Sequence, residues 1–521
     1  MQAICDVSAL QPDGRTVKKI DGKQLLICQQ SNQVFVVDNR CPHEGYPLSE
    51  GHLSDDCQLT CNWHNWKFDL TSGETLVGGD QLRHYPCQVV NGEVWVDLSD
   101  LPLEQQQSKA LQGLHLAFKE HDYTRMAREL VRYHAADGCL DDALVAACEW
   151  AAPELSYGMT HAYAAAPQWL RLADEMKPNT DLQLLPWLEC IGHLSWDVLQ
   201  DVERREFTTR SRAYDGAAMA IALDNENEDL AISYLNGALA AAQYQTVLLD
   251  LQRWSFTHYQ GFGHSVIYAH QAQILCARLG PGSHSSVLQS LVRFFIMASR
   301  EDLIPEFKAY ARGLAQFQSA GGGSAVLRSE QLRHARVGKA VDLVVGALAD
   351  PQTCFDQLLL SAAEAVLHFD TQRDQAVTQK FTLNASMLDV SHTLTHLLAS
   401  RALCQSQPDL WPQALLQSAC FIGRNSAFVN SQLQQAQWQV DEPEVFFTQS
   451  IDRLLDHGEP LYIYPAHWLK MTMAIRDQVR NEPEAIWVPT LLAALNRFLH
   501  EPIKRKHMQR DLLQAQQQVL R

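Results

Sequence analysis

The sequence lacks the long apolar runs and the clustered basic charge that mark membrane and nucleic-acid-binding proteins. Its strongest apolar run, residues 340–348, is far shorter than the roughly 18 residues that a membrane-spanning helix needs. The 521 residues carry a formal net charge of −18, whereas nucleic-acid binding depends on clustered Lys and Arg. We therefore expect neither a membrane nor a nucleic acid among the partners.

The sequence also lacks a disulfide framework and an export signal. Its 13 Cys are scattered without regular spacing, and the first residues, MQAICDVSALQPDG, have neither a basic start nor an apolar core. Both features are typical of proteins in a reducing compartment. We therefore expect a cytoplasmic protein.

Length and patterning predict a multidomain protein, with a small all-β domain followed by a large all-α domain. A chain of 521 residues exceeds what one hydrophobic core usually organises. Residues 1–104 have the pattern of short strands, with a hairpin turn at Asn91-Gly92. Residues 105–521 carry helix formers with apolar residues three and four apart. A Gly-rich segment, residues 319–324, predicts two diverged halves within the helical domain.

The strongest chemical signal is a pair of Cys/His motifs within residues 41–64. Cys41 and His43 form a C-x-H pair, and Cys61 and His64 form a C-x-x-H pair. Two thiolates and two imidazoles are the ligand set of a Rieske [2Fe-2S] centre. A structural zinc site is the alternative, but it usually takes C-x2-4-C and H-x3-5-H pairs, which these motifs fit poorly.

The residues after the second pair complete a run that resembles the Rieske ferredoxins and the Rieske domains of ring-hydroxylating oxygenases. That run comprises Trp63, Trp66, Phe68, Asp69 and then Thr-Ser-Gly-Glu at 71–74. The resemblance implies that Cys41 and Cys61 hold one iron of the cluster and that His43 and His64 hold the other.

The ligand loops depart from the family pattern at two positions and lack a disulfide. Asn62 and Asn65 stand where the family usually has Pro and Gly, so the loop backbone can differ there. Without a loop disulfide and with few hydroxyl donors, the cluster is expected toward the low end of the roughly −150 to +300 mV Rieske window. It should then donate electrons. Cys57 and Cys87 lie outside the motifs and are predicted to be packing residues.

The resemblance also implies a destination for these electrons. In Rieske oxygenases it is a mononuclear iron held by two His and a carboxylate. Asp389, His392 and His396 fall on one face of a predicted helix and could share a metal. Their spacing is one residue shorter than the oxygenases' D-x2-H-x4-H, and the helical context differs from the mixed α/β domain of those enzymes. The alternatives are an N-cap role for Asp389 and hydrogen-bonded core His residues.

A turn followed by a His near the start of an apolar helix recurs in the helical part. The four His residues are His161, His264, His392 and His467. Their intervals are too unequal for a solenoid, but the flanking helices should direct them into one interior. Because several buried imidazoles need partners, we predict that some of these residues, together with His396, hold a second metal, with iron preferred.

Other His groups carry weaker signals. The pairs Glu189/His193, Glu330/His334 and Glu364/His368 are predicted to be surface or capping pairs, and the Glu-x-x-His motif of ferritin-like di-iron proteins does not occur. His258 and His270 flank His264 among aromatic residues that could line a cavity for an aromatic substrate or form an ordinary core: Trp254, Tyr259, Phe262 and Tyr268. The helical part is also similar to questin-oxidase-like proteins, all-α oxygenases with scattered His, although no discrete motif carries that likeness.

These observations predict an oxidoreductase, specifically an oxygenase in which the cluster passes single electrons to a His-rich metal site acting on a small molecule. No phosphate loop, G-x-G-x-x-G or G-x-S-x-G motif occurs, so an external reductase or ferredoxin must re-reduce the cluster. The alternative is a redox-sensing or electron-transfer protein whose helical domain is a partner-binding scaffold without a metal.

Overall fold

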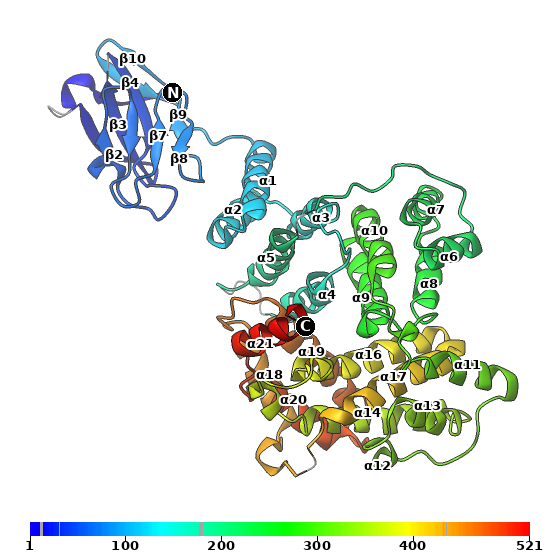
Figure 1. Ribbon diagram of the computed structural model, residues 1–521. Coiled ribbons are helices and arrows are strands. Elements are labelled where there is room, and N and C mark those ends of the chain that lie inside the picture. The colour runs from blue at the N-terminus through cyan, green and yellow to red at the C-terminus, as the bar shows by residue number, and fades with distance from the viewer. Residues whose placement is uncertain are drawn as a thin grey trace. The chain divides into compact units, whose positions relative to one another are not determined.

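A computed structural model describes residues 1–10, 14–30, 32–176, 181–201, 203–430, 432–433 and 435–520. The chain divides into two compact units, Met1–Ala143 and Leu144–Arg521. In Figure 1 the first unit holds the blue strands and the first two helices, and the second unit is helical throughout. The predicted succession of a small β domain and a large α region is therefore confirmed.

The β domain consists of three small antiparallel sheets. Their strand orders are β1-β11-β10, β2-β3-β4-β9 and β5-β6-β7-β8. The strands are β1 (Gln2–Asp6), β2 (Arg15–Ile20), β3 (Lys23–Gln30), β4 (Gln33–Asp38), β5 (His52–Leu53), β6 (Gln58–Thr60), β7 (Lys67–Asp69), β8 (Thr75–Val77), β9 (His84–Tyr85), β10 (Cys87–Val90) and β11 (Glu93–Val96).

The local sequence explains the hairpins of this domain. Val90 pairs with Glu93 across the turn between β10 and β11, and Asn91 and Gly92 both take positive φ, at 53° and 84°. This is the type I′ turn that Asn-Gly favours. At the centre of the domain, Leu25 to Cys28 of β3 are completely buried, so this strand contributes side chains to the apolar clusters on both of its faces.

Two helices belong to the same compact unit as the strands. They are α1 (Leu103–Glu120) and α2 (Tyr123–Ala135), which pack against each other. Asp80 is only 1% exposed and accepts hydrogen bonds from Arg128 Nε at 2.8 Å and Arg132 Nη1 at 2.9 Å. These charge-assisted bonds join the β domain to α2. The last strand ends at Val96 and α1 begins at Leu103, whereas the compact unit continues to Ala143. The domain boundary at residue 104 stays a prediction.

The rest of the chain is built from helices. They are α3 (Leu140–Ala151), α4 (His161–Glu175), α5 (Leu185–Gln200), α6 (Gly216–Asp224), α7 (Glu228–Ala240), α8 (Tyr244–Trp254), α9 (His264–Leu279), α10 (Pro281–Met297), α11 (Ala309–Ala320), α12 (Ser329–Leu332), α13 (Val337–Val345), α14 (Pro351–Leu367), α15 (Gln372–Gln375), α16 (Met387–Ser406), α17 (Trp411–Asn425), α18 (Pro443–Leu454), α19 (Ile463–Asn481), α20 (Val488–His500) and α21 (Met508–Val519).

A large hydrophobic core lies where α13, α14, α16, α17 and α20 pack together. Within it, every residue from 391 to 400 of α16 is buried, so this helix has no solvent-facing side over two and a half turns. Buried helices place their polar side chains against other helices, and α16 carries both His392 and His396.

The Gly-rich segment at 319–324 lies between α11 and α12 and is held against residues 345–349. Gly323 N–H donates to Val345 O at 3.0 Å, and a Cβ on Gly323 would meet Gly346 O at 2.4 Å. Glycine is needed here because the two backbones approach closely. The second compact unit runs across this segment, and the division into two diverged halves stays a prediction. Over the described ranges, no helix has both the length and the apolar character that crossing a membrane requires.

Candidate metal centres

The two predicted ligand loops of the β domain have the same backbone form. Cys41 N–H donates to Tyr46 O at 2.9 Å, and Cys61 N–H donates to Trp66 O at 2.8 Å. The fourth residue after each Cys has a left-handed backbone. It is Gly45 in the first loop, with φ 74°, and Asn65 in the second, with φ 60°. Asn tolerates this conformation better than other residues with a side chain, so the second loop keeps the turn without glycine.

The four predicted ligand residues lie on the two facing loops. Cys41 and Cys61 are 4% and 1% exposed and share one apolar cluster, whereas His43 and His64 are more accessible, with side chains 23% and 42% exposed. The two imidazole rings are 4.7 Å apart between centroids. Buried thiols behind exposed imidazoles suit a cluster whose histidine-bound iron faces solvent.

Neighbouring side chains fix the imidazoles. The ring of His43 stacks on that of Trp66, 4.6 Å between centroids and 8° from parallel. Glu44 places carboxylate oxygens 3.9 Å from His43 Nε2 and 4.0 Å from His64 Nδ1, and it accepts a hydrogen bond from Trp63 Nε1 at 3.1 Å. A negative charge so close to both imidazoles favours the oxidised, more positive state of a cluster bound there.

A metal ion would change the protonation state of the loop thiols. Burial raises the pKa of the Cys41 thiol to about 11, so without a metal this thiol stays protonated at neutral pH. A metal ion reverses this, because a coordinating thiol loses its proton outright. Cys57 lies in the same apolar cluster, and Cys87 donates its S–H to Val34 O at 3.2 Å. Both cysteines pack in the domain as predicted. All cysteines that the structure describes are free, so the loops have no disulfide.

Residues 1–87 match the family model of the Rieske [2Fe-2S] domain. A 3-phenylpropionate/cinnamic acid dioxygenase ferredoxin subunit of Photorhabdus laumondii is 31% identical over 99 residues, which are 19% of this chain and 93% of that protein. The chain belongs to the Rieske family.

Two further likenesses cover the same share of the chain. The ferredoxin component of an alkene monooxygenase system of Xanthobacter autotrophicus is 28% identical over 102 residues, 19% of this chain and 84% of that protein. The ferredoxin of carbazole 1,9a-dioxygenase from Nocardioides aromaticivorans, a solved structure, is 22% identical with a TM-score of 0.18, covering 19% of this chain and 97% of that one. The matched proteins are electron-transfer components of oxygenase systems, and the Rieske domain implies a [2Fe-2S] cluster.

Four His residues from four helices meet in the helical unit. His161 and His264 are the first residues of α4 and α9, His392 lies in the second turn of α16, and His467 is the fifth residue of α19. The predicted position near a helix start and the predicted common interior are therefore found for all four. We call these residues the four-histidine group.

Backbone carbonyls fix the tautomer of three of these imidazoles. His264 Nδ1 lies 2.5 Å from Gly261 O, His392 Nδ1 lies 3.2 Å from Asp389 O, and His467 Nδ1 lies 2.7 Å from Ile463 O. A carbonyl oxygen only accepts hydrogen bonds, so each Nδ1 must carry the proton. Each Nε2 then presents a lone pair, which is the state of a histidine that binds a metal.

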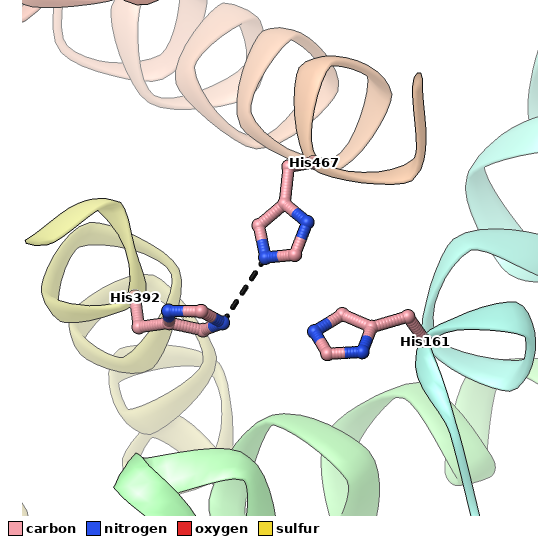
Figure 2. A group of neighbouring side chains, drawn as sticks. All are labelled: His161, His392 and His467. Carbon is pink, nitrogen blue, oxygen red and sulfur yellow. Dashed lines mark hydrogen bonds between the residues drawn. The ribbon is translucent and has the colours of Figure 1, made fainter. Parts of the chain in front are cut away.

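The Nε2 atoms point toward one another. His392 and His467 Nε2 are 3.0 Å apart, as are His161 and His264 Nε2. Ligand atoms of His161, His392 and His467 all lie within 4.8 Å of one another. Figure 2 shows these three rings approaching from three helices, with the His392–His467 contact dashed. With both protons held on Nδ1, two lone pairs face each other at this contact, an arrangement that a cation would stabilise.

The surroundings keep these imidazoles neutral. His392 and His467 are 6% and 0% exposed. Burial lowers the pKa of His392 to about 3. Burial and the charge of Lys470 also lower the pKa of His161, His264 and His467 well below the ordinary value. An added proton is therefore disfavoured, and a metal ion is the cation that suits four neutral imidazoles.

The structure separates the members of the predicted Asp389/His392/His396 trio. The Asp389 carboxylate caps α16, accepting from Ser386 N–H at 2.7 Å, and is exposed. His396 is buried with both ring nitrogens in contact with other side chains: Nδ1 lies 3.2 Å from Ser418 Oγ and Nε2 lies 3.3 Å from Gln417 Oε1. The reason is tertiary, because His396 faces α17 while His392 faces α4, α9 and α19.

The aromatic residues around His264 do not form one wall. Tyr259 packs against Phe307 and Phe421 in the core, Trp254 packs against Phe295, and Phe262 is 55% exposed. Tyr268 alone of the four reaches the four-histidine group, with its hydroxyl 3.4 Å from His161 Nδ1.

The remaining His side chains have other environments. His258 lies between Asp224 and Asp302 in an ion-pair network with Arg300, and His270 is partly buried on α9. Glu330 and His334 lie on the surface, as predicted. Glu189 and His193 are 4% and 3% exposed, so the surface prediction is wrong for that pair, because α5 turns both side chains inward. Glu364 accepts from Arg333 at 2.9 Å, and His368 contacts Gln435.

Sequence reasoning missed two residues beside the four-histidine group. Lys470 is 4% exposed and burial lowers its pKa to about 7. Asp197 accepts a hydrogen bond from Thr160 Oγ1 at 2.6 Å, and Thr160 caps the helix that starts with His161. The only available signal was the spacing of His467 and Lys470, which are three residues apart on one predicted helix.

Proposed function

We propose that this protein is an iron-dependent oxidoreductase of the oxygenase type. A Rieske cluster held by Cys41, Cys61, His43 and His64 supplies single electrons to a second metal, which the four-histidine group binds in the helical unit. The observation that carries the proposal is the convergence of neutral Nε2 atoms whose protons are fixed on Nδ1 by backbone carbonyls. The oxygenase systems named for the related ferredoxins support the reaction class.

The spacing of the nitrogens is compatible with ligands that share one ion. Metal–imidazole bonds are about 2.1 Å long, so two nitrogens on one ion lie about 3.0–3.4 Å apart. Both short Nε2 pairs measure 3.0 Å, and ligand atoms of His161, His392 and His467 all lie within 4.8 Å of one another. These three imidazoles would hold the metal, with His264 beside His161. Imidazole suits several first-row metals, and we propose iron because it can take up the single electrons of the cluster.

The electron supply follows from the cluster chemistry. A [2Fe-2S] centre delivers one electron at a time, and reduction of dioxygen needs more than one, so the cluster must be re-reduced during turnover. An external reductase or ferredoxin is the donor in this scheme, and the exposed His64 and Trp63 are the natural point of contact, with Trp63 60% exposed. The free cysteines favour a reducing compartment, and we propose the cytoplasm.

Iron and sulfide analysis of the full chain tests the proposal. After anaerobic reconstitution, we expect one iron beyond the two of the cluster, together with two labile sulfides and the electron resonance signal of a reduced Rieske centre. His392→Ala should lose the additional iron and keep the signal. His64→Ala should lose the signal and keep the additional iron.

His396→Gln is the matched control. His396 lies on α16 one turn beyond His392 and is equally buried, but its ring nitrogens contact Ser418 and Gln417. This variant should retain the additional iron. If the wild-type chain binds no metal beyond the cluster and His392→Ala changes nothing, the metal site is refuted, and the helical unit is better described as a partner-binding scaffold.

A further inference from the structure

Lys470 is a buried cation without a partner beside the four-histidine group. It follows His467 by three residues on α19, so the two side chains share one face of the helix. Its Nζ has no hydrogen-bond partner among the described residues, and the side chain is 4% exposed. Burying an unpaired ammonium is costly, so the charged form of Lys470 needs an anion beside it.

The position of Lys470 on α19 places its side chain beside the metal site. It is buried one turn beyond His467, and α19 packs against α4 and α16, the helices that carry His161 and His392. The acidic side chains of the flanking helices have other roles, since Asp389 caps α16 and Asp197 accepts from Thr160.

The charge balance of the site with the ammonium form of Lys470 favours an anion from outside the chain. Neutral imidazoles leave the charge of a divalent metal uncompensated, and Lys470 adds a further positive charge in the same buried region. An anionic group between metal and ammonium would satisfy both cations at once, as charge-assisted contacts do in buried sites. A neutral ligand would leave the ammonium unpaired.

We propose that the Lys470 ammonium binds an anionic oxygen of the ligand that occupies the four-histidine metal. This inference rests on the proposed function, and it assigns the substrate to molecules that carry a carboxylate or a phenolate oxygen. Lys470 acts as a binding residue in this role and supplies no electrons or metal bond.

The test compares an anionic and a neutral metal ligand on the full chain with iron at both centres. Azide is the anionic probe and imidazole the neutral one, and calorimetric titration measures each dissociation constant. The cluster irons already have a full ligand set, so both probes report on the second site. We expect Lys470→Met to weaken azide binding at least tenfold and leave imidazole binding within about twofold, while Lys470→Arg keeps the wild-type affinity for azide.

Displacement of azide by acetate or by 4-nitrophenolate then distinguishes a carboxylate from a phenolate as the preferred anion. If Lys470→Met loses the second iron, Lys470→Gln provides the same comparison with a polar, uncharged side chain. Equal azide affinity in the wild type and the uncharged variants, or an equal loss for azide and imidazole, would overturn the inference while leaving the metal site intact. Absence of the second iron from the wild type would instead refute the proposed function, and the inference with it.

Discussion

Gly158 should be the most sensitive single position in the segment that leads into His161. It has φ 77°, and its N–H donates to Leu155 O at 3.0 Å. A Cβ at this position would meet Phe294 N and Ser290 O, each at 2.4 Å. Both are backbone atoms within α10, so neither can move aside without distorting that helix.

The cost of Gly158→Ala follows from three contributions. A left-handed backbone costs an L-residue about 1–2 kcal/mol, overpacking costs about 1–3 kcal/mol, and the hydrogen bond from Met159 N–H to Ser290 O, 2.9 Å long, contributes about 1 kcal/mol. We therefore expect a loss of about 3–6 kcal/mol in the free energy of unfolding of the helical unit. Displacement of this segment should also move His161 and lower the amount of the second iron bound per chain.

Gly458→Ala is the control for backbone strain alone. Gly458 has φ 60° and is exposed, and a Cβ there would have no atom within 4 Å. Its expected cost is only about 1–2 kcal/mol. Urea unfolding followed by far-ultraviolet circular dichroism, with iron analysis of each variant, makes the comparison. Equal losses of stability in the two variants, with full iron in both, would refute the argument from close packing.

Two further substitutions test the supports of the site. Burial raises the pKa of Asp197 from 3.8 to about 7, so the folded state is favoured below about pH 4 and loses stability as the pH rises to 7. Relative to Asp197→Asn, the free energy of unfolding of the wild type in urea should fall by about 2–4 kcal/mol between pH 4 and 7.5. The same pH dependence in both proteins would contradict this. Arg293 is 0% exposed and donates to the Glu228 carboxylate and to three backbone carbonyls, those of Ala152, Leu155 and Arg205. Arg293→Met should cost about 3–5 kcal/mol in the free energy of unfolding because it leaves a carboxylate and three carbonyls without their partner. A loss below about 1 kcal/mol would show that the network is dispensable.

The cluster loops could be predicted from the sequence because their chemistry is local. Both Cys/His pairs lie within 24 residues, and hydrogen bonds that span five residues shape each loop. One of the two departures from the family pattern, Asn65 in place of Gly, keeps the left-handed backbone at φ 60°. The substitution is conservative in conformation although the residue types differ.

The helical site could be predicted only in part, because tertiary packing selects its members. Helix periodicity alone places Asp389, His392 and His396 on one face, and nothing local distinguishes a residue that faces α17 from one that faces α4. The recurrence of a turn before a His was the better guide. It fixes the residue at a helix start, where a nearby carbonyl holds Nδ1 and directs Nε2 outward from the helix. The role of Lys470 required knowledge of which buried groups lack partners.

The contrast in exposure between the two centres fits a division of labour. His64 and Trp63 of the cluster loops are accessible, and an accessible cluster edge lets a protein donor approach closely enough to pass electrons. His392 and His467 are 6% and 0% exposed, so a metal held there would be shielded from bulk water. Burial also strengthens each charge interaction at the site, so a single ammonium such as that of Lys470 can decide which ligands bind there. The low dielectric constant that makes burial of an unpaired Lys470 ammonium costly would therefore also let Lys470 select substrates by their charge.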